Sequence, residues 1–339
     1  KLCLFRYKLY VWIGLGVLMK KRLLIPIIIS LIFSSCSDFR GNEDAVEASL
    51  KPGTTTTTDD DDETTTRTYY DLDGIAFGNN TFVAIGESGV VRTSSDNGAT
   101  WDNGTSGTTK QLNEIAYGNS TFVTVGQSGT HLYSTDDGTS WSDGTWSSTA
   151  NVTGVAFGDN KFVGVSSSYL TVSTDNGANW STGCSGVYVY DITFGNSKFV
   201  ASGSVGAIQT SSNGNSCTTG NSGTTTNTLY GITFGNDRFL TVGSTGWLSI
   251  STDNGSTFGS LTTPTSYSLY SVAYGNNIFV AVGNQRVVVD NNTGGNATIT
   301  ENTLSFNDVT FGNGVFVAVG NNEIIYTSTD GDSWTKVYP

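Results

Sequence analysis

The sequence predicts an all-β protein, a seven-bladed β-propeller of four-stranded antiparallel blades, and two observations support this expectation. An aromatic-Gly-Asn/Asp triplet recurs at intervals of 40, 40, 37, 40, 40 and 37 residues. Each unit also holds four short apolar or alternating runs separated by turn residues, as in LDGIAFG, TFVAIG, GVVRTS and TWDNGTSG of the first unit. Repeats of this length that consist of short strands are typical of propeller blades. The triplets begin at Phe77, Tyr117, Phe157, Phe194, Phe234, Tyr274 and Phe311.

Turn residues mark the joints inside each unit. In the first unit Gly78-Asn79-Asn80, Ser88-Gly89 and Asp96-Asn97-Gly98 separate the four expected strands. A blade has two apolar faces, and a closed ring covers both with neighbouring blades. An open solenoid is the alternative. Both terminal units are full repeats without polar caps, so we expect a closed ring with no strand exchanged between the first and last blades.

The N-terminal segment 1–35 differs from the rest, with six of the sixteen Lys and Arg residues and no acidic residue. From Met19 it reads as a signal peptide, with a basic start, an apolar run and small residues before Cys36. Ser34, Ser35 and Cys36 resemble the lipidation box of bacterial lipoproteins, in which the cysteine is lipidated. Residues 1–18 are interpreted as upstream sequence from a misplaced gene start; an uncleaved membrane anchor built from both apolar runs is the alternative.

The segment 36–67 is rich in Thr and Asp, and its low apolar content predicts a disordered stalk. A calcium site in the acidic run 59–63 is the alternative, but an unbroken run lacks the turn that wraps ligands around an ion. The propeller is then expected over 68–339. Residues 36–339 carry ten basic and 29 acidic side chains, a net charge near −19, which excludes nucleic acid and anionic membrane surfaces as partners.

A second motif recurs near the end of most units, Ser-x-Asp-x-Gly-x-Thr-Trp in its first copy at 94–101. It resembles the Asp-box, or BNR repeat, of sialidase-like propellers, and the whole unit is similar to sortilin-like and photosystem-assembly-factor-like propellers. The resemblance covers about residues 70–339 and implies a turn between the third and fourth strands. Identical carboxylates spread around a ring cannot converge on one substrate, so their role is expected to be structural. The five aspartates are Asp96, Asp136, Asp175, Asp253 and Asp330.

Two units depart from the motif. Unit four reads TSSNGNSC, interpreted with Ser212 at the aspartate place and Cys217 at the tryptophan place, and unit six reads VDNNTGGN. Cys184 lies in the last strand of the preceding unit. A disulfide between Cys184 and Cys217 would suit an oxidising compartment, and buried free thiols are the alternative.

Few residues of the sequence suggest a catalytic function. Sialidases use three arginines together with Tyr, Asp and Glu, and no Arg-Ile-Pro motif precedes the first unit. Arg92, Arg238 and Arg286 occupy different repeat positions. His131 is the one histidine in the sequence, which argues against multi-histidine metal sites and a Ser-His-Asp arrangement. We therefore expect no catalytic residue, metal or cofactor.

A binding function has better candidates. Three tyrosines occupy the start of the first strand in units four to six, and polar residues of varied type follow the second strand in several units, with Trp247 nearby. Aromatic faces among amides are suited to sugar rings and peptides, although tyrosines can also fill the joints between blades. The candidate ligand-binding residues are Tyr190, Tyr230, Tyr270, Trp247, Glu87, Gln127, Asn284 and Asn321.

The sequence thus predicts an extracytoplasmic, membrane-anchored bacterial lipoprotein at the outer membrane or cell surface. Its propeller is expected to be a monomeric, non-catalytic binding or assembly module for a glycan or protein ligand. A sialidase-like glycoside hydrolase and an envelope protein-complex assembly factor are the alternatives.

Overall fold

The computed structural model describes residues 53–57, 65–166, 168–186, 188–224, 226–263, 265–284, 287–290, 297–299 and 305–339. The predicted signal segment, Cys36 and Arg286 lie outside the described residues. Within the predicted stalk, β1 (Gly53–Thr57) and β2 (Thr65–Tyr69) pair antiparallel. The expectation of a disordered stalk did not include this pairing, which the β-branched threonines of both segments favour.

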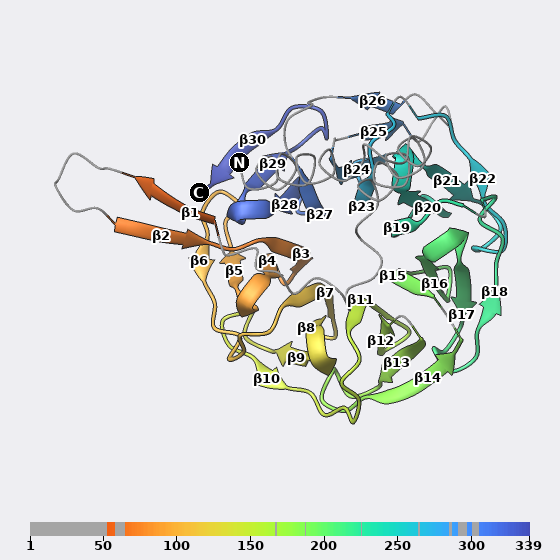
Figure 1. Cartoon of the computed structure of the whole chain (residues 1–339), viewed down its shortest axis with the longest axis horizontal. Helices are drawn as coiled ribbons and strands as arrows, with labels where there is room; N and C mark the ends of the chain where they lie inside the picture. The colour runs from red at the N-terminus through yellow and green to blue at the C-terminus, as the bar shows by residue number, and fades with distance from the viewer. Residues whose placement is uncertain are drawn as a thin grey trace, which may run out of the picture. The chain divides into compact units, whose positions relative to one another are not determined.

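Seven four-stranded antiparallel sheets follow, each built from four consecutive strands. They are arranged radially, with the first strand of each sheet innermost and the fourth on the rim (Figure 1). We call these sheets blades 1 to 7 in chain order. The first strands are β3 (Leu72–Gly78), β7 (Leu112–Gly118), β11 (Val152–Gly158), β15 (Val189–Gly195), β19 (Leu229–Gly235), β23 (Leu269–Gly275) and β27 (Phe306–Gly312). The second strands are β4 (Thr81–Gly86), β8 (Thr121–Gly126), β12 (Lys161–Ser166), β16 (Lys198–Gly203), β20 (Arg238–Gly243), β24 (Ile278–Gly283) and β28 (Val315–Gly320).

The outer strands are shorter. The third strands are β5 (Val91–Ser94), β9 (His131–Ser134), β13 (Tyr169–Ser173), β17 (Ile208–Ser211), β21 (Leu248–Ser251), β25 (Val287–Asp290) and β29 (Ile325–Ser328). The fourth strands are β6 (Asp102–Asn103), β10 (Ser142–Asp143), β14 (Ser181–Ser185), β18 (Thr218–Thr219), β22 (Gly259–Ser260), β26 (Ala297–Ile299) and β30 (Thr335–Tyr338). The predicted class, an all-β propeller of four-stranded antiparallel blades, is confirmed. Blades 1 and 7 each contain only their own strands, so no strand is exchanged between them.

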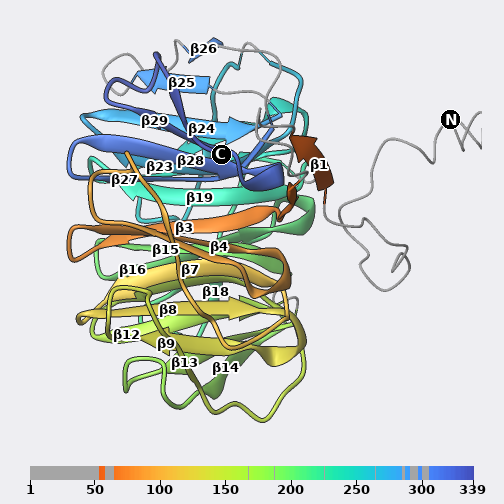
Figure 2. The same cartoon turned by 90° about the vertical axis from the view of Figure 1, so that its left-hand side faces the viewer.

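The strands run roughly along the ring axis, and their turns therefore lie on two opposite faces (Figure 2). One face carries the turns between first and second strands and between third and fourth strands. The other carries the links between blades and short 3-10 turns after five of the second strands. These turns are η2 (Glu87–Gly89), η3 (Gln127–Gly129), η4 (Ser204–Gly206), η5 (Ser244–Gly246) and η6 (Asn321–Glu323). We call the latter face the link face.

The recurring aromatic-Gly pair is explained by contacts between blades. A Cβ on Gly78 would lie 2.0 Å from the ring of Tyr117 in the next blade, so only glycine leaves room for that ring. The same contact between a glycine and the aromatic ring of the next blade recurs around the molecule. It ends at Gly312, where a Cβ would lie 2.1 Å from the ring of Phe77 in blade 1. The last and first blades therefore meet through the same contact as every other pair, and the ring closes.

Apolar side chains fill the space between neighbouring blades. Blades 1 and 7 share one such cluster, which includes Ile75 and Phe82 from blade 1 with Val317 and Val319 from blade 7. All four are no more than 3% exposed. Each second strand is buried on both faces, which explains why these strands read as continuous apolar runs rather than alternating ones.

A buried ion pair also joins the two end blades. Arg92 donates to both carboxylate oxygens of Glu323, at 2.8 and 2.9 Å through Nη2, and the Glu323 side chain is fully buried. The Glu323 backbone N–H donates to Tyr70 O at 2.8 Å. Glu323 occupies the place held by a glycine of positive φ in the other four 3-10 turns. The Glu323 side chain thus adds a contact between blades 7 and 1, whereas the other four 3-10 turns have no side chain at this place.

Candidate functional site

The repeated Ser-x-Asp-x-Gly motif forms the turn between the third and fourth strands, which we call the SxDxG turn. In blade 1, Asp96 Oδ1 accepts from Ser94 Oγ at 2.8 Å and from Thr100 N at 2.9 Å, and Oδ2 accepts from Thr100 Oγ1 at 2.6 Å. Trp101 Nε1 donates to Gly98 O at 3.0 Å. The aspartate therefore binds its own turn with both oxygens, and little capacity remains for a ligand.

The other turns repeat these bonds with little change. Hydrogen bonds from the Thr100 side chain and backbone lower the pKa of Asp96, which keeps the carboxylate ionised. The pKa values of Asp136, Asp175, Asp253 and Asp330 are also lowered: burial acts in the opposite direction, and the hydrogen bonds within each turn outweigh it. All five aspartates lie on the face opposite the link face, and each serves its own turn.

Blade 4 requires a correction. Asn213, and not Ser212, takes the aspartate place: its Oδ1 accepts from Asn215 N at 2.9 Å and Ser216 N at 3.1 Å. The motif is one residue shorter here, and the assignment of Ser212 did not take this deletion into account. Cys217 does replace the tryptophan, and it forms a disulfide bond with Cys184, with the Cα atoms 5.9 Å apart. Most of the unit-six segment lies outside the described residues.

A central pocket of about 390 Å³ opens where the seven first strands begin. In every first strand the register shifts between the first and third residues, which is a β-bulge. A bulge leaves one residue unpaired, so the usual alternation between two faces is broken. The second and third residues of most first strands consequently line the same pocket.

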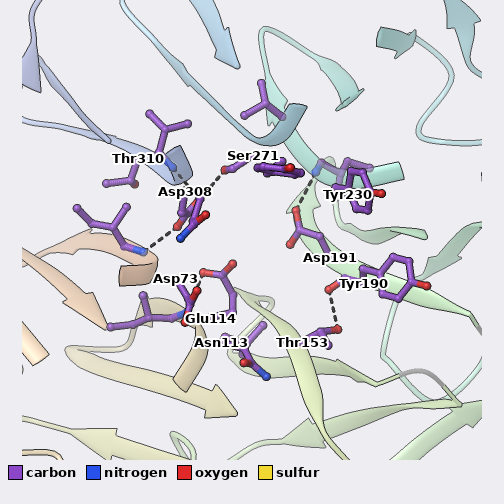
Figure 3. Close-up of a pocket in the computed structure, with 18 of the residues that line it drawn as sticks. Asp73, Asn113, Glu114, Thr153, Tyr190, Asp191, Tyr230, Ser271, Asp308 and Thr310 are labelled. Carbon is purple, nitrogen blue, oxygen red and sulfur yellow. Dashed lines mark hydrogen bonds between the residues drawn. The ribbon is translucent and has the colours of Figure 1, made fainter. Parts of the chain in front are cut away.

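Three of the predicted binding residues line this pocket, namely Tyr190, Tyr230 and Tyr270. The rings of Tyr230 and Tyr270 meet edge to face with centroids 5.6 Å apart, and Tyr270 Oη donates to Asn284 Oδ1 at 3.3 Å. In Figure 3 the labelled tyrosines lie on one side of the pocket, with Asp308 and Asp73 toward the other. The predicted arc of tyrosines is thus present at the pocket.

The other predicted binding residues belong to the link face but do not line the pocket. Glu87 accepts from Asp71 N at 3.4 Å, and Gln127 Nε2 donates to Gln111 Oε1 at 2.9 Å. Asn321 Oδ1 accepts from Asn307 Nδ2 at 2.9 Å, and Asn284 binds Tyr270 as given above. Trp247 is half-buried against the apolar cluster between blades 4 and 5. These five side chains therefore lie on the link face but outside the pocket wall.

Carboxylates at the third position of the first strands were missed by the sequence analysis. Asp308 Oδ2 accepts from Ile75 N at 2.7 Å, and its Oδ1 accepts from Ser271 Oγ. Asp191 Oδ2 accepts from Ile232 N at 2.8 Å. The bonds from Ile75 N to Asp308 and from Ile232 N to Asp191 each join two neighbouring blades, and they satisfy backbone N–H groups on the inner edge of a sheet. Glu114 Oε1 accepts from its own neighbour Ile115 N at 2.8 Å.

The pocket strongly affects the titration of these groups. Burial raises the pKa of Asp191 to about 7 and that of Asp308 to about 6, although backbone N–H donors oppose the shift. Burial, followed by the charges of Asp308, Asp191 and Asp73, raises the pKa of Glu114 well above its ordinary value. The pocket therefore concentrates negative charge that is only partly expressed at neutral pH.

A signal for these carboxylates does exist in the sequence. The third residues of the seven first strands are Gly, Glu, Gly, Asp, Gly, Ser and Asp in chain order. A Cβ on Gly154 would lie 3.0 Å from Asp191 Cα, and one on Gly231 would lie 3.0 Å from Ser271 Cα. Glycine in one blade therefore makes room for the polar residue of the next. A conventional two-residue period would have assigned this position to the core, because a bulge cannot be read from the period alone.

The lining of the pocket includes no Lys, Arg or His. Arg92 is held by Glu323, and Arg238 lies in β20 at the opposite face. His131 is buried away from the pocket between Trp146 and Trp180, with ring centroids 4.8 and 4.4 Å apart. Within the described ranges, no three His, Cys, Asp or Glu residues are grouped so that they could hold a metal ion. None of the helices in this part of the chain is long and apolar enough to cross a membrane.

Fold and site together define the class of protein as a β-propeller with an acidic central pocket that has tyrosines along one side. No family model matches the sequence, and a search of curated proteins found no match. Among solved structures, the chain is similar to YCF48 from Cyanidioschyzon merolae, with 18% identity, a TM-score of 0.61, and coverage of 76% of this chain and 95% of that one.

A structure of YCF48 bound to D1 peptide matches with 16% identity and a TM-score of 0.55, over 67% of this chain and 81% of that one. PorZ, a surface component of the type-IX secretion system of Porphyromonas gingivalis, matches with 10% identity and a TM-score of 0.60, over 80% of this chain and 38% of its own. At these identities the likeness shows the propeller fold.

Proposed function

We propose that this propeller is a non-catalytic binding module that holds a segment of another protein at the pocket on its link face. The observation that carries the proposal is the pocket itself, a polar cavity of about 390 Å³ with three tyrosines from successive blades in its wall. Cavities of about 300–1,000 Å³ are typical of ligand sites, and aromatic rings beside polar groups suit peptide recognition.

The comparisons support this choice of ligand. A propeller of similar fold, YCF48, has been seen with D1 peptide bound, and PorZ is described as an essential component of a secretion system. Of these two propellers, YCF48 is thus known with a peptide ligand. We therefore favour a protein ligand over a glycan, and we propose that binding it serves an assembly role in the cell envelope.

The test is a parallel screen of the purified protein on a peptide array and a glycan array. We expect peptides to bind, and we expect the double variant Tyr230→Ala/Tyr270→Ala to weaken the binding. The variant Trp334→Ala, which alters an SxDxG turn on the opposite face, serves as the matched control and should leave binding unchanged. Binding of glycans alone, or binding that survives the double variant, would contradict the proposal.

A sialidase-type activity is the enzymatic alternative, and the lining of the pocket argues for the binding role. Sialidases bring arginines to the substrate carboxylate, whereas the pocket here has acidic and aromatic residues and no arginine in its wall. We interpret the SxDxG turns as Asp-boxes with a purely structural role. Glycosidase assays with sialoside and general substrates should show no turnover; hydrolysis abolished by Asp191→Asn would overturn the non-catalytic assignment.

We further propose that the propeller is tethered outside the cytoplasm by a lipid on Cys36, behind the signal segment 1–35. The support is the order of basic residues, apolar run, small residues and cysteine in the sequence. Cys36→Ala should release the protein from the membrane fraction or stall its processing. Unchanged detergent partitioning together with normal signal cleavage would show that the anchor is wrong.

A further inference from the structure

Large apolar side chains are exposed on the link face of blades 4 to 6. Tyr188 is 66% exposed, Val205 64% and Tyr267 53%. Tyr188 directly precedes β15, Val205 lies in η4, and Tyr267 lies two residues before β23. Tyr188 and Val205 are close in space, because Ser204 N donates to Tyr188 O at 2.9 Å. We call these three residues the apolar rim.

Two residues of the apolar rim are close in sequence to tyrosines of the pocket. Tyr190 stands two residues after Tyr188, and Tyr270 three residues after Tyr267, and both line the cavity. Exposed apolar side chains that cluster beside a cavity mark an interaction surface more often than isolated ones do. The rim and the three pocket tyrosines all belong to the link-face ends of blades 4 to 6, and we call them together the aromatic surface.

The negative charge of the pocket limits which ligands can bind there. The pocket holds Asp73, Glu114, Asp191 and Asp308, and no basic side chain lines it to neutralise them. The carboxylates come from blades 1, 2, 4 and 7, and they are close enough for the charges of Asp308, Asp191 and Asp73 to raise the pKa of Glu114. Hydrogen bonds from backbone N–H groups hold three of them in place.

We propose that the aromatic surface and the pocket together bind an extended protein segment in which a lysine or arginine is flanked by apolar residues. This inference rests on the proposed function and specifies the chemistry of its ligand. The basic head group enters the pocket and meets the carboxylates, its aliphatic stem packs against the tyrosine rings, and the flanking residues cover the apolar rim.

Proton linkage gives this binding a characteristic pH dependence. A bound cation favours ionised carboxylates, whereas burial in the free protein raises the pKa of Asp191 to about 7 and that of Glu114 well above its ordinary value. Binding must therefore release protons, and affinity should rise as the pH is raised from 6 to 8. A ligand bound only by apolar contacts would show no such dependence.

The experiment uses the purified full chain and pairs of fluorescein-labelled short peptides. One member of each pair has a central lysine between apolar residues, and the other has N-acetyllysine at the same place. Fluorescence anisotropy gives the affinities at pH 6 and pH 8. Asp191→Asn and Glu114→Gln test the pocket, and the second variant keeps an acceptor for Ile115 N. Asp237→Asn, an exposed carboxylate on the opposite face, is the matched control.

We expect the lysine peptides to bind and their acetylated partners to bind much more weakly. At pH 8 each pocket variant should lose roughly tenfold in affinity, as expected for one charge-assisted contact, while Asp237→Asn binds as the parent does. Thermal melts of both variants separate lost contacts from lost folding.

Three results would overturn the inference in different ways. If lysine and acetyllysine peptides bind equally and only the tyrosine variants weaken them, the basic specificity is wrong and the proposed function stands. If no peptide of either kind binds while the glycan array is positive, both are wrong. Saturable binding of calcium alone, abolished by Asp191→Asn, would make the pocket a metal site and would also contradict the inference.

Discussion

Asp96 illustrates how a residue that looks catalytic serves the backbone instead. Its carboxylate takes three hydrogen bonds from Ser94 and Thr100, all within its own turn. Asn213 holds the corresponding turn of blade 4 with one amide oxygen. The structural need is therefore for an acceptor at this place and not for a negative charge.

This comparison predicts a graded effect of substitution. Asp96→Ala should lower the free energy of unfolding by about 1 kcal/mol, because the turn loses its acceptor. Asp96→Asn should cost less, since an amide oxygen can replace Oδ1. Urea unfolding of the two variants measures both effects. Equal losses in both, or lost ligand binding with parental stability, would show that the charge itself matters.

His131 is a second residue with a strong local requirement. Its side chain is almost fully buried between two indole rings, and Nε2 has no hydrogen-bond partner. Burial is the main cause that lowers the pKa of this imidazole to about 4. The folded state therefore holds the ring neutral under conditions in which an unfolded chain would protonate it.

Acid should consequently destabilise the protein through His131. Between pH 6.5 and about 4 the unfolded chain binds a proton that the folded chain does not, so this group contributes a loss of about 2 kcal/mol from pH 7 to pH 5. Denaturant unfolding of the parent and of His131→Phe at both pH values isolates this loss as the difference between their pH slopes. Asp191 and Asp308 have raised pKa values and act with the opposite sign. Their contribution to the stability of the folded state is lost as the pH rises from about 4 to 7. A parental pH slope in His131→Phe would contradict the assignment.

At the scale of the strand and turn, blade 4 shows how one element substitutes for another. The other described SxDxG turns carry an aromatic ring, and the four tryptophans among them each donate Nε1 to the glycine carbonyl of the same turn. Blade 4 has Cys217 instead, and the disulfide to Cys184 ties its turn to β14 of blade 3. A covalent link thus replaces a packing contact.

Removing that link should be measurable. The bridge joins residues 33 positions apart, and closing a loop of that size stabilises a protein by roughly 4 kcal/mol in the chain-entropy view. We expect a reducing agent to lower the melting temperature of the parent, and Cys184→Ser/Cys217→Ser to match the reduced parent. The double variant should be insensitive to the reductant. A melting temperature unaffected by reduction would contradict this role.

The first strands show where sequence reasoning succeeded and where it stopped. The blades could be predicted from the repeat, because the aromatic-Gly pairs and the apolar second strands recur at regular intervals. The tyrosines at the pocket followed too, because they share one repeat position. Asp191, Asp308 and Glu114 did not, because a bulge turns two successive residues toward the pocket and the expected alternation hides the second.

For the whole molecule, closure of the ring depends on contacts between residues more than 200 positions apart in sequence. Phe77 packs on Gly312, and Asp308 accepts from Ile75 N. The Arg92 and Glu323 pair adds a buried charge contact at the same boundary. Sequence analysis predicted closure without strand exchange, but it could not identify this ion pair, because neither residue has a charged equivalent in the other blades.

The pair gives a direct test of the closure. Glu323→Ala should destabilise the protein by about 3 kcal/mol, because Arg92 would remain largely buried without its partner. The Lys161 and Asp159 pair, in which the Asp159 side chain is 63% exposed, offers a control, and Asp159→Asn, which suits the positive φ of this position, should cost less than about 1 kcal/mol. Chemical unfolding of both variants measures the difference. Equal small losses would show that the end blades do not depend on the ion pair.

The central claim is that the pocket on the link face is the binding site of the propeller, and amide hydrogen exchange tests it most directly. The full chain is labelled with and without a peptide selected on the array, and protection is mapped along the chain. The account predicts slower exchange around 188–192, 228–232 and 267–272, with no change at the SxDxG turns. Protection confined to those turns, or to the outer strands β10, β14 and β18, would contradict it.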